Sequence, residues 1–303
     1  MKDAPGVPKN KIPKWVPWSI AGVALAYFLA AAVVSALLLR GNDSIQVRAL
    51  ARWLPVPVAR VGGQLVWARE YLDYRAFIET FMARTNQSTD VITTESPLGR
   101  QVITLLVSNK VLERAAKEEG VSVTEAEVND AYDDILVAQG GNAPREVTQE
   151  ELRTILNELY GSTQAQLHGL IRIQLLEDKV RSSVIEQVRF RHILVRDEAR
   201  AREVLEQLKG GGDFTALAHE FSEHLESRDN GGDMGFVSRG QQSEAMERAL
   251  FTNSLGLIGE SVQSEFGFHL VELLERKGTA QQTFDAWLAD AKAKYHASVY
   301  LRV

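Results

Sequence analysis

The sequence predicts an α+β protein with a single transmembrane helix, a mostly α-helical lobe and a smaller α/β module that has a small antiparallel sheet. Three features predict it. A long apolar segment lies near the N-terminus, helical apolar periodicity runs through the middle of the chain, and the alternating β-branched segment Val188–Val195 begins a region of short helices and strands. With 303 residues, the chain has room for two soluble modules beside an anchor.

The N-terminal segment Trp18–Leu39 contains no charged residue and is long enough to cross a hydrocarbon core of about 30 Å as a helix. Four lysines precede it, which predicts a cytoplasmic N-terminus. A cleaved signal peptide is the alternative, but its apolar region is usually only about 7–15 residues long. We therefore expect a cytoplasmic tail at residues 1–16 and an uncleaved signal anchor at residues 17–40. The protein would then be single-pass in the inner or plasma membrane, with periplasmic C-terminal domains and the lipid bilayer as a partner.

Composition excludes several kinds of chemistry. The chain has no cysteine, so it has no disulfide, thiolate nucleophile or cysteine-ligated zinc. His219 and His224 are five residues apart, which does not suit a metal site on one helical face, and we predict neither metal nor cofactor. Five of the 34 basic and one of the 40 acidic residues lie in residues 1–40, so 29 basic and 39 acidic residues follow. This acidic balance argues against a nucleic-acid partner.

Helical patterns dominate residues 41–187, after a strand and Gly-Gly turn predicted at residues 57–66. Apolar side chains recur at helical spacing within residues 103–111 and 167–175. Capping-box sequences predict helix starts near Thr124, Thr148 and Thr163, each followed three residues later by Glu or Gln. At the C-terminus, an apolar helical face precedes the strand-like residues 298–303, which need a sheet edge. We expect Pro57–Val61 to supply that edge.

Five sequence blocks carry a more specific signal, because they occur together in one order over some 90 residues. They are Arg191–Val195, Gly212–Phe214 with Leu217–Ala218 and Phe221–Ser222, Gly231–Gly235, Ala249–Phe251, and Phe266–His269. In this order they resemble a parvulin-type (PpiC-like) peptidyl-prolyl cis-trans isomerase domain. The region before them resembles the helical chaperone portion of SurA-, PrsA- and PpiD-like foldases, most clearly at residues 57–63 and 115–127. In such proteins the C-terminal helix and strand fold back onto the N-terminal module.

Isomerisation of an X–Pro bond needs neither a nucleophile nor a cofactor. The planar amide resists rotation by about 18–20 kcal/mol, and a site accelerates rotation by favouring the twisted amide over both planar forms. The resemblance implies that His192 and His269 form a hydrogen-bonded floor on neighbouring strands. It also implies an apolar proline slot above them, to which Met234 belongs, and a core position for Met234 is compatible with that role.

The chain departs from the family pattern in two places. The family has Cys or Asp two residues after the Phe/Tyr-Ser pair, where this chain has His224, with Glu223 as the alternative. Slot positions usually held by Met and Phe align with Gln242 and Met246, and Ser264 and Phe266 complete the expected substrate-binding set. A short insert without a basic loop argues against phospho-Ser/Thr specificity.

We expect a membrane-anchored, extracytoplasmic isomerase and foldase for exported or membrane proteins, acting on unfolded or nascent polypeptides with X–Pro bonds. The alternatives are a chaperone whose isomerase site is weak or inactive, and an accessory subunit of a membrane protein complex that docks through Ile20–Leu39. The expected domains are a helical chaperone lobe at residues 41–187, a parvulin-like domain at residues 188–277, and a C-terminal helix and strand at residues 278–303 that complete the helical lobe.

Overall fold

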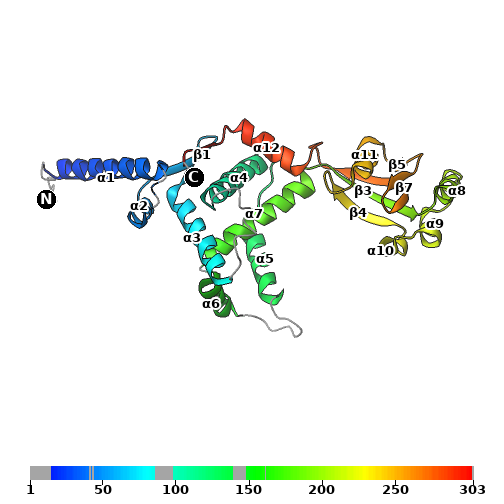
Figure 1. The fold of residues 1–303 in the computed structure, drawn as a ribbon, viewed down its shortest axis with the longest axis horizontal. Coiled ribbons are helices and arrows are strands. Elements are labelled where there is room, and N and C mark those ends of the chain that lie inside the picture. The colour runs from blue at the N-terminus through cyan, green and yellow to red at the C-terminus, as the bar shows by residue number, and fades with distance from the viewer. Residues whose placement is uncertain are drawn as a thin grey trace, which may run out of the picture. The chain divides into compact units, whose positions relative to one another are not determined.

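The computed structural model describes residues 15–40, 42, 44–85, 98–138, 148–160 and 162–301 (Figure 1). The chain divides into two compact units. The first comprises residues 1–108, 153–163 and 295–303, and the second comprises residues 109–152 and 164–294. Each unit therefore combines segments that are distant in the sequence.

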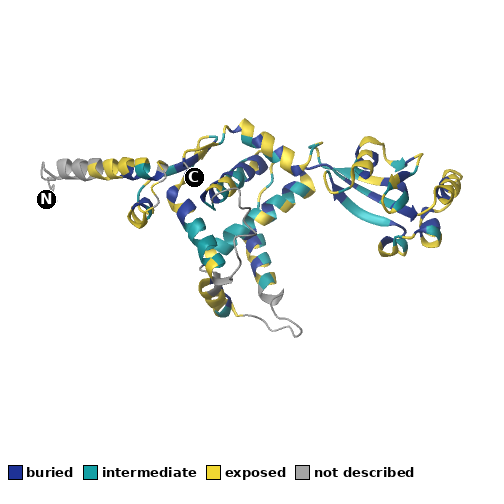
Figure 2. Ribbon diagram, in the orientation of Figure 1, coloured by how far each residue is buried: buried dark blue, intermediate teal, exposed yellow. Residues whose placement is uncertain are grey.

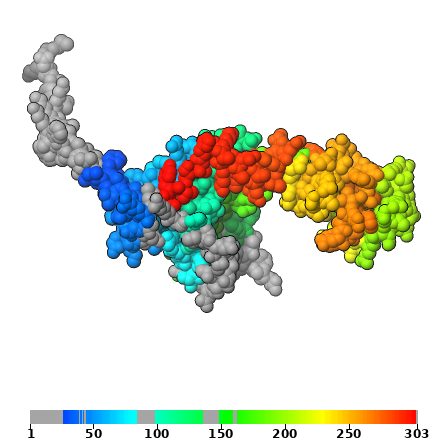
Figure 3. Space-filling view, turned by 45° about the horizontal axis from the view of Figure 1, so that its top comes forward, coloured from blue at the N-terminus to red at the C-terminus, as the bar shows by residue number. Residues whose placement is uncertain are grey.

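A small antiparallel sheet organises the first unit, with the strand order β2-β1-β8. Strands β1 (Pro57–Val61) and β2 (Gln64–Trp67) form a hairpin, because Gly62 and Gly63 both adopt the positive φ angles that the tight turn requires. The C-terminal strand β8 (Ser298–Val299) pairs with β1, which confirms the predicted partner edge. Figure 3 shows this C-terminal segment, in red, beside the N-terminal part of the chain, in blue.

Helices occupy most of the chain before the larger sheet. Their bounds are α1 (Trp15–Leu39), α2 (Ile45–Ala51), α3 (Ala68–Thr85), α4 (Leu98–Glu118), α5 (Glu125–Ala138), α6 (Gln149–Tyr160) and α7 (Gln164–Ser183). Two of the predicted capping boxes form as expected. The Glu127 carboxylate accepts from the Thr124 N–H at 2.8 Å, and the Glu151 carboxylate accepts from the Thr148 N–H at 3.0 Å.

The second unit contains the larger antiparallel sheet, with the strand order β4-β3-β7-β5 and with β6 also paired to β7. Its strands are β3 (Gln187–Val195), β4 (Asp233–Ser238), β5 (Gly256–Leu257), β6 (Val262–Ser264) and β7 (Gly267–Lys277). The helices that follow β3 in the sequence are α8 (Glu198–Lys209), α9 (Phe214–Phe221), α10 (Leu225–Arg228), α11 (Glu244–Thr252) and α12 (Phe284–Lys294).

Alternation along β3 and β7 divides the core of this sheet between its two faces. Phe190 and Val271 pack with α11 on one face, whereas Ile193 and Leu270 pack with α8 and α9 on the other. In Figure 2 the central strands are mostly buried or intermediate, and α8 exposes its outer side to solvent. Helices thus cover both faces of the sheet. Because side chains alternate along β3, His192 lies on the same face as Phe190, the face covered by α11.

The chain enters and leaves the sheet region side by side. Ile185 forms a parallel bridge with Ala280, and the Glu186 N–H donates to the Ala280 carbonyl at 3.0 Å. Gly278 makes this contact possible, because a Cβ at that position would lie 2.2 Å from the Ile185 carbonyl oxygen. Backbone contacts therefore join the two ends of the segment that runs from residue 185 to residue 280.

The α+β architecture, with helices and antiparallel sheets, agrees with the prediction, but the transmembrane element is contradicted. No helix in the described part of the chain is both long enough and apolar enough to cross a membrane. The predicted signal anchor at residues 17–40 and the single-pass membrane location are corrected accordingly. The two predicted membrane partners, the lipid bilayer and a membrane protein complex, are not shown by this structure.

Candidate active site

The candidate site is built on two neighbouring strands. In the β3–β7 register His192 lies opposite Val271, and His269 lies opposite Leu194. The two histidines are therefore diagonal neighbours on one face of the sheet. Their ring centroids are 5.2 Å apart, and the Nδ1 atoms lie 3.1 Å from each other, within hydrogen-bond distance.

Gly232 lets the β4 segment approach the His192 backbone. The His192 N–H donates to the Gly232 carbonyl at 2.9 Å, and a Cβ on Gly232 would lie only 2.3 Å from the His192 carbonyl oxygen. Gly267 plays the same part at the start of β7, where a Cβ would lie 2.4 Å from the Val195 carbonyl oxygen. Glycines in two of the motif blocks thus permit the close strand contacts that hold the histidine pair.

A chain of hydrogen bonds fixes the two imidazoles. The Ser264 hydroxyl accepts from the Phe266 N–H at 3.1 Å and lies 2.7 Å from His269 Nε2. In one consistent proton arrangement Ser264 donates to His269 Nε2, His269 donates from Nδ1 to His192 Nδ1, and His192 carries its proton on Nε2. Among the described residues, His192 Nε2 is a buried side-chain atom that has no hydrogen-bond partner.

Both histidines are buried, with 4% of His192 and 6% of His269 exposed. Burial lowers the pKa of His192 to about 3, and the neighbouring His269 and His224 add to the shift. Burial also lowers the pKa of His269, with a further contribution from His224. The pair is therefore neutral near pH 7, so it can orient a substrate by hydrogen bonding and is poorly suited to act as a cationic acid.

The third predicted histidine, His224, lies beside the pair at the N-terminal end of α10. Its ring centroid is 4.8 Å from that of His192, and its Nδ1 lies 2.8 Å from the Ser227 hydroxyl. Glu223, the alternative at this position, instead forms an ion pair with Arg196 at 2.7 Å. The end of β3 also holds this loop, because the Glu223 N–H donates to the Leu194 carbonyl. His224 is thus the residue that faces the histidine pair.

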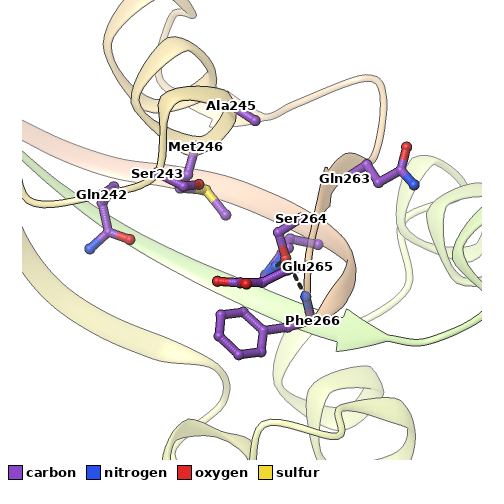
Figure 4. Close-up of a pocket in the computed structure, with 9 residues that line it drawn as sticks. Gln242, Ser243, Ala245, Met246, Gln263, Ser264, Glu265 and Phe266 are labelled. Atoms are coloured by element: carbon purple, nitrogen blue, oxygen red, sulfur yellow. Dashed lines mark hydrogen bonds between the residues drawn. The ribbon is translucent and has the colours of Figure 1, made fainter.

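An open cleft of about 440 Å³ lies over His269 (Figure 4). One wall comes from the start of α11 and the loop before it, and the other from the β6–β7 turn. The lining residues are Gln242, Ser243, Ala245, Met246, Gln263, Ser264, Glu265, Phe266 and His269. Four of the five predicted substrate-binding residues are among them. Met234 is not, and it packs against the core cluster beneath α11.

Sequence reasoning missed Gln263, Glu265, Ser243 and Ala245 in this lining. Glu265 could have been found, because it lies between the predicted residues Ser264 and Phe266 in a tight turn. Phe266 is 68% exposed, whereas Met246 is 5% exposed and forms both cleft wall and core. The cleft thus has an apolar side, an exposed aromatic ring and one carboxylate.

The arrangement can orient an amide without covalent chemistry. Neither the neutral histidines nor Ser264 resembles an activated nucleophile, since the Ser264 hydroxyl bonds to a histidine that is itself paired with another histidine. Within the described residues, no group of His, Asp and Glu side chains is arranged to hold a metal ion.

An antiparallel sheet covered by helices, with paired histidines beneath a half-apolar cleft, defines a parvulin-type domain. Comparison with protein families agrees. Residues 173–277 match the PPIC-type PPIASE domain, and residues 14–181 match the SurA-like N-terminal domain. The second match covers more than half of the chain, so the chain belongs to the SurA-like N-terminal domain family and carries a PPIC-type PPIASE domain in addition.

Curated relatives include foldases. The foldase protein PrsA of Caldanaerobacter subterraneus subsp. tengcongensis is 32% identical over 189 residues, which are 61% of this chain and 58% of the relative. Foldase protein PrsA 4 of Bacillus cereus is 29% identical over 183 residues, which are 59% of this chain and 62% of the relative. The matches therefore span less than two thirds of each relative's length.

Two solved structures are among those to which this chain is similar. The parvulin domain of PpiD from E. coli is 32% identical, with 32% of this chain and 93% of that chain covered and a TM-score of 0.29. The peptidylprolyl isomerase PrsA from Bacillus anthracis is 22% identical, with 63% of this chain and 85% of that chain covered and a TM-score of 0.32.

Proposed function

We propose that this protein is a foldase that catalyses cis–trans isomerisation of X–Pro bonds in unfolded exported polypeptides. The observation that carries the proposal is the contact between the His192 and His269 Nδ1 atoms, 3.1 Å apart beneath a cleft of about 440 Å³. The proline ring would lie against Met246 and Phe266, and the histidine pair with Ser264 would orient the rotating amide. Preorganised donors and acceptors favour the twisted amide, because its charge distribution differs from that of the planar forms.

The roles of the remaining residues follow from their positions. We propose that His192 and His269 act as orienting groups, with His224 supporting His192 from the side. Gln242 and Ser264 would contact the client backbone at the rim of the slot. We also propose that residues 188–277 act as the isomerase module, that residues 41–187 hold the client chain, and that residues 278–303 complete the helical lobe.

The test is a proline-peptide isomerisation assay on the intact chain and on His192→Ala and His269→Ala. We expect a loss of at least about tenfold in kcat/KM for each, which corresponds to roughly 1.4 kcal/mol of transition-state stabilisation. His219→Ala is the matched control, because the His219 side chain is 74% exposed on α9. Circular dichroism would check that each variant is folded.

A second readout separates the isomerase from a pure chaperone. Suppression of aggregation of an unfolded client would be measured for the same variants. If the intact chain has no isomerase activity while suppression persists in all variants, the isomerase proposal is overturned and a binding function remains.

A further inference from the structure

The cleft carries a charge that the proposed isomerisation does not use. Of the nine lining residues, Glu265 is the one with a formal charge near pH 7, since burial lowers the pKa of His269. In Figure 4 its side chain extends from the β6–β7 turn into the space between Met246 and Phe266. Its carboxylate therefore lies where a residue beside the bound proline would pass.

The turn that carries Glu265 is held in place on both sides. The Ser264 hydroxyl accepts from the Phe266 N–H and bonds to His269 Nε2 at 2.7 Å, so the residues that flank Glu265 are tied to the floor of the cleft. Strand pairing of Ser264 with Gly267 closes the turn. A carboxylate on a fixed turn gives a directional contact, because little backbone freedom is lost when a ligand binds.

No cation within the described part of the chain neutralises Glu265. The nearby Arg196 is paired with Glu223 at 2.7 Å, and Arg191 is paired with Glu272 at 2.5 Å. Other carboxylates in this region are similarly engaged, since Glu247 accepts from the Gly240 and Gln242 N–H groups. Glu265 is thus an unpaired negative charge at the wall of a concave, half-apolar site, where such a charge attracts cationic ligands.

We infer that Glu265 is a specificity-determining residue that makes the cleft prefer X–Pro segments with Lys or Arg directly beside the proline. The inference rests on the proposed function and names its substrate class. A cationic side chain at that place gains an ion pair with Glu265, and an acidic one is repelled. Because the carboxylate is exposed, the preference is moderate, with a factor of about 3 to 10 between Lys and Glu in otherwise identical peptides.

The experiment uses the intact chain and short peptides that differ at one position, with Lys, Leu or Glu placed before the proline in one series and after it in another. We expect kcat/KM in at least one series to follow the order Lys, Leu, Glu. Glu265→Gln is expected to bring the three values within about twofold of one another, and Glu265→Lys is expected to invert the order. Raising NaCl to about 0.5 M is expected to shrink the preference of the unmodified chain.

The matched control is Glu260→Gln, which makes the same change in net charge at an exposed position outside the cleft lining. It is expected to leave the preference unchanged. Equilibrium binding of fluorescent versions of the same peptides provides a readout that does not require catalysis. If the unmodified chain catalyses all three peptides of both series equally well, the inference about Glu265 is overturned and the proposed function stands. If it catalyses none but binds the Lys peptide more tightly, and Glu265→Gln removes that difference, the proposed function fails and the charge preference stands.

Discussion

At the scale of single residues, the histidine pair shows how burial determines chemistry. His192 and His269 lie on a sheet face that continues directly into the apolar core under α11, so water does not stabilise their charged forms. Each ring is instead held by a hydrogen bond from a fixed neighbour. A neutral, oriented pair follows from this environment.

The first prediction concerns the pH dependence of stability. In the unfolded chain the His192 imidazole has a pKa of about 6.5, whereas in the folded chain its pKa is lowered to about 3. The unfolded state therefore binds more protons between these values, and the free energy of unfolding falls as the pH falls from 6.5 toward 3. We expect His192→Asn to reduce this slope by up to about 1.4 kcal/mol per pH unit in urea unfolding experiments. An unchanged slope would mean that His192 is protonated in the folded protein.

A second prediction concerns Gly232. Its φ of +81° and its approach to the His192 carbonyl oxygen leave no room for a Cβ atom. Gly232→Ala is therefore expected to cost more than about 2 kcal/mol of unfolding free energy and to disturb the histidine pair. Gly235→Ala is the control, because it has a similar φ of +68° but nothing within 4 Å of its Cβ position, so it bears the backbone strain alone. Equal losses in the two variants would refute the steric argument.

At the scale of elements, Glu186 links the base of the β3–β7 sheet to the wall of the cleft. It is 2% exposed, and its carboxylate pairs with Arg239 at 2.6 Å and with Arg276 at 2.5 Å. Arg276 also donates to the Leu250 and Asn253 carbonyls at the C-terminal end of α11. The helix that carries Met246 is thus held at its far end by a buried ionic cluster.

The third prediction follows from that cluster. Glu186→Gln removes the negative charge that pairs with two partly buried arginines, Arg239 and Arg276, and we expect a loss of about 3–5 kcal/mol of unfolding free energy in chemical denaturation. The control is Glu244→Gln, because the Glu244 side chain, which pairs with Arg248, is 91% exposed, and exposed ion pairs contribute little to stability. A loss below about 1 kcal/mol for Glu186→Gln would show that the arginines find other partners.

At the scale of the whole molecule, the chain repeatedly joins segments that are far apart in sequence. Strand β8 is added to the hairpin β1–β2 near the other end of the chain, and the Gly62 N–H donates to the Tyr295 carbonyl at 2.8 Å. Tyr295 and Leu301 are both buried. The C-terminal residues therefore contribute to the core of the first compact unit.

The fourth prediction is that truncation after Lys294 destabilises the β1–β2 hairpin selectively. The amides of residues 57–61 are expected to exchange with deuterium faster, because β1 becomes an edge strand and loses the buried Tyr295 and Leu301 side chains. Residues 188–195 are expected to keep their protection, since their strand partners lie within residues 233–277. Equal loss of protection in both regions would contradict independent stability of the two compact units.

The sequence by itself determined the local elements and the order of the site-bearing blocks. Thr124 with Glu127 and Thr148 with Glu151 could be predicted as helix starts, because a capping box is a contact between residues three positions apart. The partner strand for residues 298–303 could be predicted because an unpaired strand needs an edge, and β1 offered one. The transmembrane prediction is contradicted. It rested on the length and composition of one segment, which are less specific than a contact between two named residues.

Only the tertiary structure decided which side chains meet. His192 and His269 are 77 residues apart, and their contact depends on a strand register that places them as diagonal neighbours. The choice between Glu223 and His224, the presence of Glu265 in the cleft and the burial of Glu186 depend on the same long-range packing. Local hydrogen bonding is specified by neighbouring residues, whereas these contacts form only after the backbone between them has folded, and sequence spacing carries no information about their distance.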